Sequence, residues 1–205
     1  MTGNAQVDAL ERIMPATHGA DEEIDWRAAE ATWGTRFPAD YVAFMHRFGA
    51  GGINGEANIL LPLAKQGPQW DPDQMAEETA NARTAWSAVG GRAAFESAPE
   101  HILAWGVTAG ADILCWHTED PDPDRWPVLV CGRHTAEEFA LYPYGMAEFL
   151  RRLFADEFDV NPVSLVFWDS ERPQSFVNWR EAQRRWLAGL NPETGEPDPY
   201  AGAQG

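Results

Sequence analysis

Apolar residues recur at helical spacing in several parts of this chain. Between residues 38 and 48 they occupy positions i, i+3, i+4 and i+7, which puts them on one face of a helix: Tyr41, Phe44, Met45 and Phe48. Pro38 suits the first turn of that helix, and Gly49 is expected to end it. The same spacing predicts further helices near residues 7–14, 26–33, 75–89, 144–155 and 176–190.

The pattern changes after residue 101, where short runs of β-branched, aromatic and aliphatic residues alternate with turn-forming stretches. These runs predict the strands of an antiparallel meander: Ile102–Val107, Asp112–His117, Val128–Cys131 and Phe139–Tyr142. A buried strand is also expected at Asn58–Leu61, after the glycine-rich connection Gly51–Gly55. Because helices and strands are grouped rather than alternating, the predicted fold class is α+β, with N-terminal helices and a mainly antiparallel sheet covered by helices.

One stretch has a more specific order of residues. An amphipathic helix that carries Trp26 ends at Gly34 and precedes two motifs: Phe37-Pro38-Ala39-Asp40-Tyr41-x-x-Phe44 and Gly49-Ala50-Gly51-Gly52. This order resembles the SUKH superfamily, whose members are also called SMI/KNR-type domains. Phe37 stands where the family usually has leucine, and Ala50 stands near its usual asparagine.

Later residues are similar to the second part of such a domain. They are the run from Asp112 to Trp116, the run from Trp126 to Val130, and the helix with a Met-x-x-Phe-Leu pattern that follows Tyr142. The resemblance therefore spans residues 24–154. It implies an α+β domain that binds other proteins, found in bacteria largely as immunity proteins against toxins and in fungi as a regulator of cell-wall synthesis. It implies no catalytic residues.

The chain is expected to divide into three parts. Residues 1–158 form the SUKH-like domain, and residues 159–190 form a docked C-terminal extension whose helix carries Phe176, Trp179, Trp186 and Leu190 on one face. A helix reserved for a partner is the alternative for this segment. Residues 191–205 are rich in proline, glycine and acidic residues without periodicity, which predicts a mobile tail.

The charge of the chain bounds its partners. Fifteen Lys and Arg residues face 32 Asp and Glu residues, a formal net charge of −17. Such a field repels phosphate backbones and anionic lipid, so nucleic-acid and membrane binding are disfavoured, whereas a basic protein partner is attracted. The alternative is that the acidic surface chiefly keeps the protein in solution.

The chain lacks the features of a secreted or membrane protein. Its N-terminus has no basic start followed by an apolar core, and no apolar run approaches the roughly 20 residues of a membrane helix. Only two cysteines are present, which suits buried thiols in a reducing compartment. A cytoplasmic location is expected.

The most charged short stretch is the acidic loop, residues 119–124, with the sequence Glu-Asp-Pro-Asp-Pro-Asp. It lacks the glycine and the distant glutamate of a calcium loop. The loop is either a solvated hairpin tip or a contact for the Arg and Lys side chains of a basic partner. Two tryptophans that flank loops are candidate anchors, so the predicted partner-binding residues are Glu119, Asp120, Asp122, Asp124, Trp126 and Trp70.

Catalytic and metal chemistry receive weaker support. The five histidines form no H-x-x-x-H or H-E-x-x-H motif, and Cys115 and Cys131 are too far apart in sequence for a Cys-x-x-Cys knuckle. A hairpin would still be able to gather both cysteines with His117 and His134 into a four-ligand site or a Cys–His nucleophile. No metal or cofactor is expected.

The preferred interpretation is a non-enzymatic protein-binding domain, an immunity protein that binds and neutralises a toxin domain. Two alternatives remain open. The first is an intracellular regulatory or scaffold protein that binds a host partner through the helix from Phe176 to Leu190. The second is a small enzyme that uses the Cys/His neighbourhood. The sequence leaves the oligomeric state open.

Overall fold

Six α-helices surround one sheet in the part of the chain that the computed structural model describes, residues 4–20, 23–63, 75–89, 95–133, 137–164 and 174–200. The helices are α1 (Ala5–Ile13), α2 (Trp26–Trp33), α3 (Ala39–Arg47), α4 (Met75–Val89), α5 (Met146–Phe154) and α6 (Trp179–Leu187). The strands are β1 (Gly51–Ile53), β2 (Ala57–Ile59), β3 (Ile102–Thr108), β4 (Ile113–His117), β5 (Val128–Cys131), β6 (Phe139–Tyr142) and β7 (Phe176–Asn178). Two 3-10 turns are η1 (Pro99–His101) and η2 (Pro123–Arg125).

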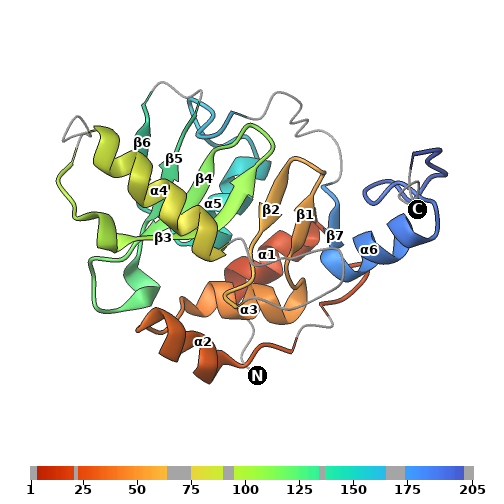
Figure 1. Cartoon of the computed structure of the whole chain (residues 1–205), viewed down its shortest axis with the longest axis horizontal. Coiled ribbons are helices and arrows are strands. Elements are labelled where there is room, and N and C mark those ends of the chain that lie inside the picture. Colours follow the sequence, from red (N-terminus) through yellow and green to blue (C-terminus); the bar gives the residue numbers. More distant parts are fainter. Residues whose placement is uncertain are drawn as a thin grey trace.

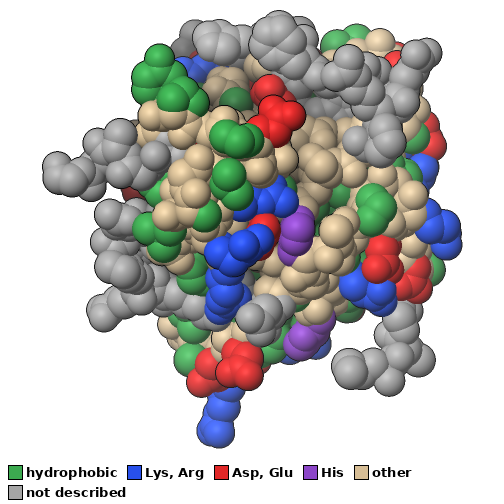
Figure 2. Space-filling model, turned by 90° about the vertical axis from the view of Figure 1, so that its right-hand side faces the viewer, with side chains coloured by type: hydrophobic (Ala, Val, Ile, Leu, Met, Phe, Trp, Pro, Cys, Tyr) green, Lys and Arg blue, Asp and Glu red, His purple; other side chains and the backbone are tan. Residues whose placement is uncertain are grey.

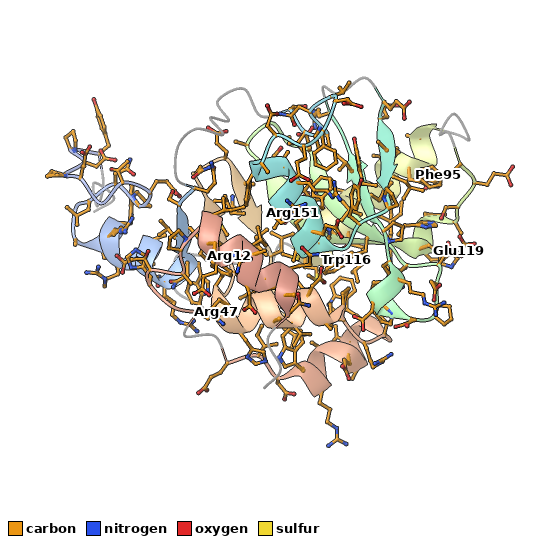
Figure 3. The ribbon with its side chains drawn as sticks, turned by 180° about the vertical axis from the view of Figure 1, so that it is seen from behind. Arg12, Arg47, Phe95, Trp116, Glu119 and Arg151 are labelled. Carbon is orange, nitrogen blue, oxygen red and sulfur yellow. The ribbon has the colours of Figure 1, made fainter. Side chains whose placement is uncertain are left out.

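The sheet has the strand order β6-β5-β4-β3-β2-β1-β7, and all neighbours are antiparallel. Helix α4 covers one face, where it packs on β3 and β4 (Figure 1). Helices α1, α3 and α5 cover the opposite face and contact one another (Figures 1 and 3). The α+β class, the antiparallel meander of β3 to β6 and the helical cover are therefore confirmed.

Helix α3 shows why this arrangement forms. Its predicted stripe is almost completely buried: Tyr41, Phe44, Met45 and Phe48. The Tyr41 hydroxyl donates to the Leu60 carbonyl at 2.6 Å, and its ring meets the Trp116 ring edge-on at 5.1 Å between centroids. An aromatic ring with a satisfied hydroxyl thus joins α3 to the centre of the sheet, where Figure 3 places Trp116.

The glycine-rich connection differs from the prediction. Residues 51–53 form strand β1 instead of a loop, and β2 begins one residue before the predicted strand and ends at Ile59. A Cβ atom on Gly51 would lie 2.3 Å from the Val177 carbonyl oxygen, so glycine is required here by the close approach of β7. The pattern of side chains could not predict a strand whose first two residues have none.

The C-terminal extension also differs in detail. Phe176 lies in β7, which pairs with β1, and the helix starts only at Trp179. The Phe176 ring packs edge-on against Phe44 and Phe48, at 5.7 and 5.4 Å between centroids. The extension thus supplies an edge strand of the sheet. The boundaries of the predicted parts stay predictions, and the predicted apolar run 165–168 lies outside the described residues.

Residues 191–200 follow a defined path beside α6. The Arg185 guanidinium donates to the carbonyl oxygens of Pro192 and Glu193 at 2.8 and 2.7 Å, and the Asp198 N–H donates to the Gly189 carbonyl at 3.0 Å. The predicted mobility of this tail stays a prediction. No helix among the described residues is long and apolar enough to cross a membrane.

Candidate protein-binding surface

The acidic loop between β4 and β5 is held in shape by its own aspartates. Asp120 Oδ1 accepts from the Asp122 N–H at 2.9 Å, and Asp122 Oδ1 accepts from the Asp124 N–H at 3.3 Å. The second of these bonds caps η2, whose first residue is Pro123. Consecutive side-chain-to-backbone turns and a proline fix the loop, so its carboxylates project from a backbone that is already ordered.

Asp124 ties this loop to a distant helix. The first residue before α3 is Pro38, which offers no side-chain cap, and Asp124 Oδ1 instead accepts from the Ala39 N–H at 2.7 Å. A carboxylate at this position satisfies a free N–H and favours the positive end of the helix dipole. One predicted binding residue therefore has a structural role, although Asp124 remains exposed.

Trp126 lies in the core. Its side chain is 3% exposed, its Nε1 donates to the Asp120 carbonyl at 2.6 Å, and its ring lies 6.2 Å from Trp116. Buried in this way, Trp126 supports the base of the loop and offers almost no surface to a partner, contrary to its predicted place as an exposed anchor. Trp70 lies outside the described residues.

Three other carboxylates of the loop reach solvent. The exposed fraction of the side chain is 64% for Glu119 and 47% for Asp122, and Asp120 is partly exposed. Arg125 lies 3.9 Å from Asp120 and 3.8 Å from Asp122. Ion pairs this long and exposed contribute little, so these carboxylates keep most of their negative field.

A cleft of about 320 Å³ opens beside the loop, between the N-termini of α3 and α5. Asp40 lies in it and accepts from the Ala147 N–H at 2.9 Å, so it caps α5. Burial raises the pKa of Asp40 and the charge of Asp124 raises it further, whereas the N–H groups of Ala147 and Tyr41 lower it. The cleft is acidic: Asp40, Asp124 and Glu148 all line it.

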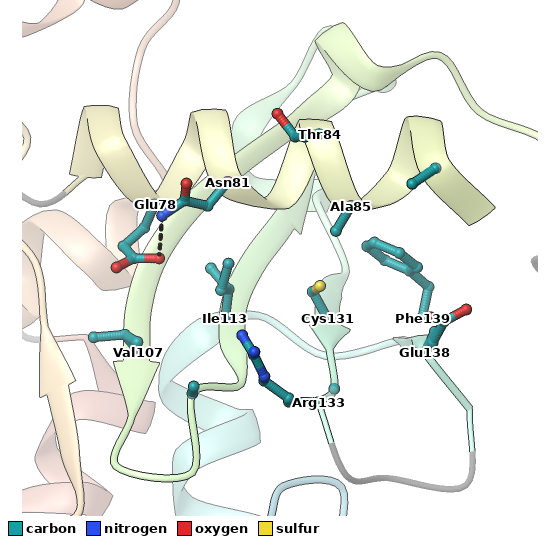
Figure 4. Close-up of a pocket in the computed structure, with 13 residues that line it drawn as sticks. Glu78, Asn81, Thr84, Ala85, Val107, Ile113, Cys131, Arg133, Glu138 and Phe139 are labelled. Atoms are coloured by element: carbon teal, nitrogen blue, oxygen red, sulfur yellow. Dashed lines mark hydrogen bonds between the residues drawn. The ribbon is translucent and has the colours of Figure 1, made fainter. Parts of the chain in front are cut away.

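Two larger hollows lie elsewhere. A groove of about 660 Å³ between α1, α2 and α3 has an apolar floor that includes Val7 and Phe37, and Arg47 on its rim. A second cavity of about 660 Å³ lies between α4 and the ends of β3 to β6 (Figure 4). Figure 4 shows Arg133 extending into the space below α4.

The strand register offsets the two cysteines of the alternative Cys/His site. Cys115 pairs with Leu129 across β4 and β5 and Cys131 pairs with Ile113, so the two cysteines are not opposite one another, and both are free. Burial raises the pKa of the Cys115 thiol well above its ordinary value and that of Cys131 to about 11. Neither thiol is activated at neutral pH, since the thiolate is the nucleophile.

The His117 side chain contacts a serine. Its Nε2 lies 2.7 Å from the Ser97 hydroxyl, and burial lowers the pKa of its imidazole. His134 lies outside the described residues. Among the residues with described positions, no group of three or more His, Cys, Asp or Glu side chains is arranged to hold a metal ion.

The face that carries α6 has a different character. Figure 2 shows basic side chains beside a histidine near its middle, with acidic side chains both among them and farther out. On this face the Arg185 guanidinium contacts the His18 imidazole, at 3.0 Å between Nη2 and Nε2. Helix α6 also leaves Leu187 67% exposed. These residues offer a second surface for the alternative in which this helix binds a partner.

The comparison with known families agrees with this fold. A family model described as the SMI1/KNR4 family (SUKH-1) matches residues 20–152, more than half of the chain. The chain belongs to the SMI1/KNR4 family. The SUKH resemblance is thereby confirmed, and the SMI1/KNR4 match includes the acidic loop but not α1, β7 or α6. No curated protein and no solved structure matches the chain.

Proposed function

We propose that this SMI1/KNR4 protein is a non-enzymatic protein-binding domain, an immunity protein that binds and neutralises a basic toxin domain in the cytoplasm. The observation that carries the proposal is the acidic loop, whose backbone is fixed while Glu119, Asp120 and Asp122 reach solvent. An ordered loop loses little conformational entropy on binding, which leaves more of the interaction energy for affinity.

Charge supports the same partner. The net charge of −17 accelerates the approach of a basic protein, and carboxylates on a fixed loop discriminate among Arg and Lys patterns at close range. The neighbouring cleft adds Asp40 to this acidic region, whereas Glu148 there is paired with Arg152 at 3.0 Å. A toxin that acts on nucleic acid would present a basic surface of this kind.

The test is co-expression with the polypeptide encoded immediately upstream, scored by growth rescue and co-purification. Rescue with a stable complex is expected. Lack of both, with both proteins folded, would remove the toxin from the proposal and favour a host-protein adaptor.

A matched pair of variants locates the surface. One replaces three loop carboxylates and keeps the acceptor oxygens of the turns: Glu119→Gln, Asp120→Asn and Asp122→Asn. The control makes the same change in charge at exposed positions elsewhere: Glu23→Gln, Glu77→Gln and Glu196→Gln. The loop variant is expected to weaken the complex by about ten-fold or more, equivalent to roughly 1.4 kcal/mol, and the control by much less. Equal effects would place the contact outside the loop.

Separate experiments test the two alternative functions, a regulator that binds a host protein and an enzyme. A regulator that binds a host protein through α6 would lose its complex on Leu187→Asp, because Leu187 is exposed on that helix. An enzyme would lose activity on Cys115→Ser or His117→Ala. The raised thiol pKa values argue against the enzyme.

A further inference from the structure

Strand β6 forms one end of the sheet. It pairs with β5 on its inner side, and in the described part of the chain no strand pairs with its outer side. The opposite end differs, because β7 leads directly into α6 there. An edge with no strand beside it has backbone N–H and C=O groups that an extended chain can pair with, and Leu141 is the residue of β6 most exposed there, at 37%.

The register shows which backbone groups face outward. Gly132 N–H donates to the Glu138 carbonyl at 2.9 Å, and Val130 stands opposite Ala140. Since hydrogen-bonding direction alternates along an antiparallel strand, Glu138, Ala140 and Tyr142 direct their backbone groups toward β5. Phe139 and Leu141 therefore direct theirs away from the sheet.

The side chains of these two residues lie on the α4 face. Leu141 pairs with the buried Leu129 and is itself 37% exposed, while Phe139 is buried against Trp86. Phe139 also lines the cavity of about 660 Å³ below α4, with Ala85 and Ala88 (Figure 4). A strand added to β6 would place alternate apolar side chains beside Leu141 and at this cavity.

Charge favours one kind of added strand. Glu137 and Glu138 precede β6 and are exposed. The other end of β6 leads to Tyr144, whose carbonyl accepts from the Val128 N–H and whose ring lies 4.3 Å from Arg152 Cζ. Arg133 also lines the cavity, together with Glu78 and Glu138. A second copy of this chain would bring like charges together, whereas a basic strand would meet Glu137 and Glu138 at the start of β6.

We propose that β6 binds an extended basic segment of a partner protein, which joins the sheet as an additional strand. Backbone hydrogen bonds to Phe139 and Leu141 provide affinity, the apolar face provides register, and the flanking carboxylates select Lys and Arg. Identification of that partner as the toxin rests on the proposed function, but the binding of a basic strand does not.

The test uses a capped peptide, Lys-Lys-Val-Thr-Val-Thr-Lys-Lys, and a counterpart in which glutamate replaces lysine. Amide chemical shifts of the full-length protein are followed during titration with each. The variant Leu141→Pro removes an outward N–H that makes no bond to β5, a substitution that an edge strand tolerates. Leu141→Ala keeps this N–H, and Leu187→Ala is the control at an exposed leucine far from the edge.

The basic peptide is expected to shift the amides of Phe139 and Leu141 most, and the acidic peptide to leave them unchanged. Leu141→Pro should weaken binding by about ten-fold or more, Leu141→Ala by less, and Leu187→Ala should bind normally. The proposal would be overturned by absent binding of the basic peptide, by equal binding to folded Leu141→Pro, or by shifts confined to residues 119–124.

Co-expression separates this proposal from the proposed function. Growth rescue without peptide binding at β6 would retain the immunity function and reject the strand site. Peptide binding without any rescue or toxin complex would retain the strand site and reject the immunity function.

Discussion

Asp40 and Asp124 join parts of the chain that are far apart in sequence. Asp124 caps α3 across 85 residues, and Asp40, the second residue of α3, caps α5 across 107 residues. Each carboxylate satisfies an N–H that its target helix cannot satisfy itself. The acidic loop, α3 and α5 are therefore positioned by the same pair of aspartates, and substitutions here will affect both stability and the shape of the candidate surface.

The raised pKa of Asp40 makes stability depend on pH at this residue. Between the ordinary value of 3.8 and the raised pKa, the folded protein holds a proton that the unfolded chain releases. The free energy of unfolding is therefore expected to increase as pH falls through this interval. Asp40→Asn keeps an acceptor oxygen and removes the titration, so wild type should gain stability relative to this variant as the solution is acidified.

Urea unfolding of both proteins at several pH values measures this difference. Glu77→Gln, at an exposed position on α4, is the control for the loss of one carboxylate. A difference between wild type and Asp40→Asn that stays constant, or moves in favour of the variant on acidification, would contradict the assignment of the raised pKa to burial.

A helix or strand could be predicted from the sequence where its own side chains mark it, and could not where it depends on pairing with distant residues. Helix α3 followed from the spacing of its apolar residues, and strands β3 to β6 followed from short runs of β-branched, aromatic and aliphatic residues, most of which are buried. Strands β1 and β7 did not, because the first two residues of β1 are glycines and β7 is defined by its pairing with β1 across more than 100 positions. Such pairing leaves no period in the sequence.

Only part of the candidate surface could be predicted from the sequence. The charge and position of the acidic loop followed from the sequence, but its caps depend on the placement of α3 and could not be derived from local spacing. The burial of Trp126 left a signal that the sequence interpretation missed. Trp126 lies two and four residues before Val128 and Val130, so the period of a strand places it on their buried face.

The Arg185 side chain links helix α6 to the segment after it. Arg185 is 12% exposed, donates to Glu181 at 2.8 Å, and also donates to the two carbonyl oxygens of the following turn. Arg185→Lys should release residues 191–200, because a lysine cannot reproduce the fork of the guanidinium. Amide hydrogen exchange of Asn191 and Asp198 is expected to accelerate, while the core exchanges as before.

Arg184→Lys is the matched control for this prediction. Arg184 also pairs with Glu181, at 2.7 Å, but it is 69% exposed and makes no described contact with residues 191–200. Exchange at Asn191 and Asp198 should be unchanged in this variant. Equal acceleration in both variants would show that the bonds specific to the Arg185 guanidinium do not order the segment.

At the scale of the whole molecule, the two candidate contacts are neighbours. The acidic loop precedes β5, and β6 pairs with β5 at the outer edge of the sheet, so one partner would be able to contact the loop and extend along β6. The loop and β6 would then attract the partner over different distances. Charge on the loop guides approach over about 10 Å at moderate salt, whereas backbone pairing at β6 acts only in contact.

The net charge of −17 should give salt opposite effects on stability and on association. Without a partner, salt screens the repulsion among carboxylates, so the melting temperature is expected to rise between about 20 mM and about 300 mM sodium chloride. With a basic partner, the same screening removes electrostatic attraction, so the association rate constant should fall by about ten-fold or more over this range, with a much smaller change in dissociation. Calorimetry measures the melting temperature, and stopped-flow fluorescence measures the association rate constant.

The loop variant, with Glu119, Asp120 and Asp122 replaced, should reduce the salt dependence of the association rate constant more than the control variant with Glu23, Glu77 and Glu196 replaced. The reason is that charges near the contact steer docking more strongly than the same charges placed elsewhere. Equal salt slopes for these two variants would show that the overall field, and not the loop, guides the partner.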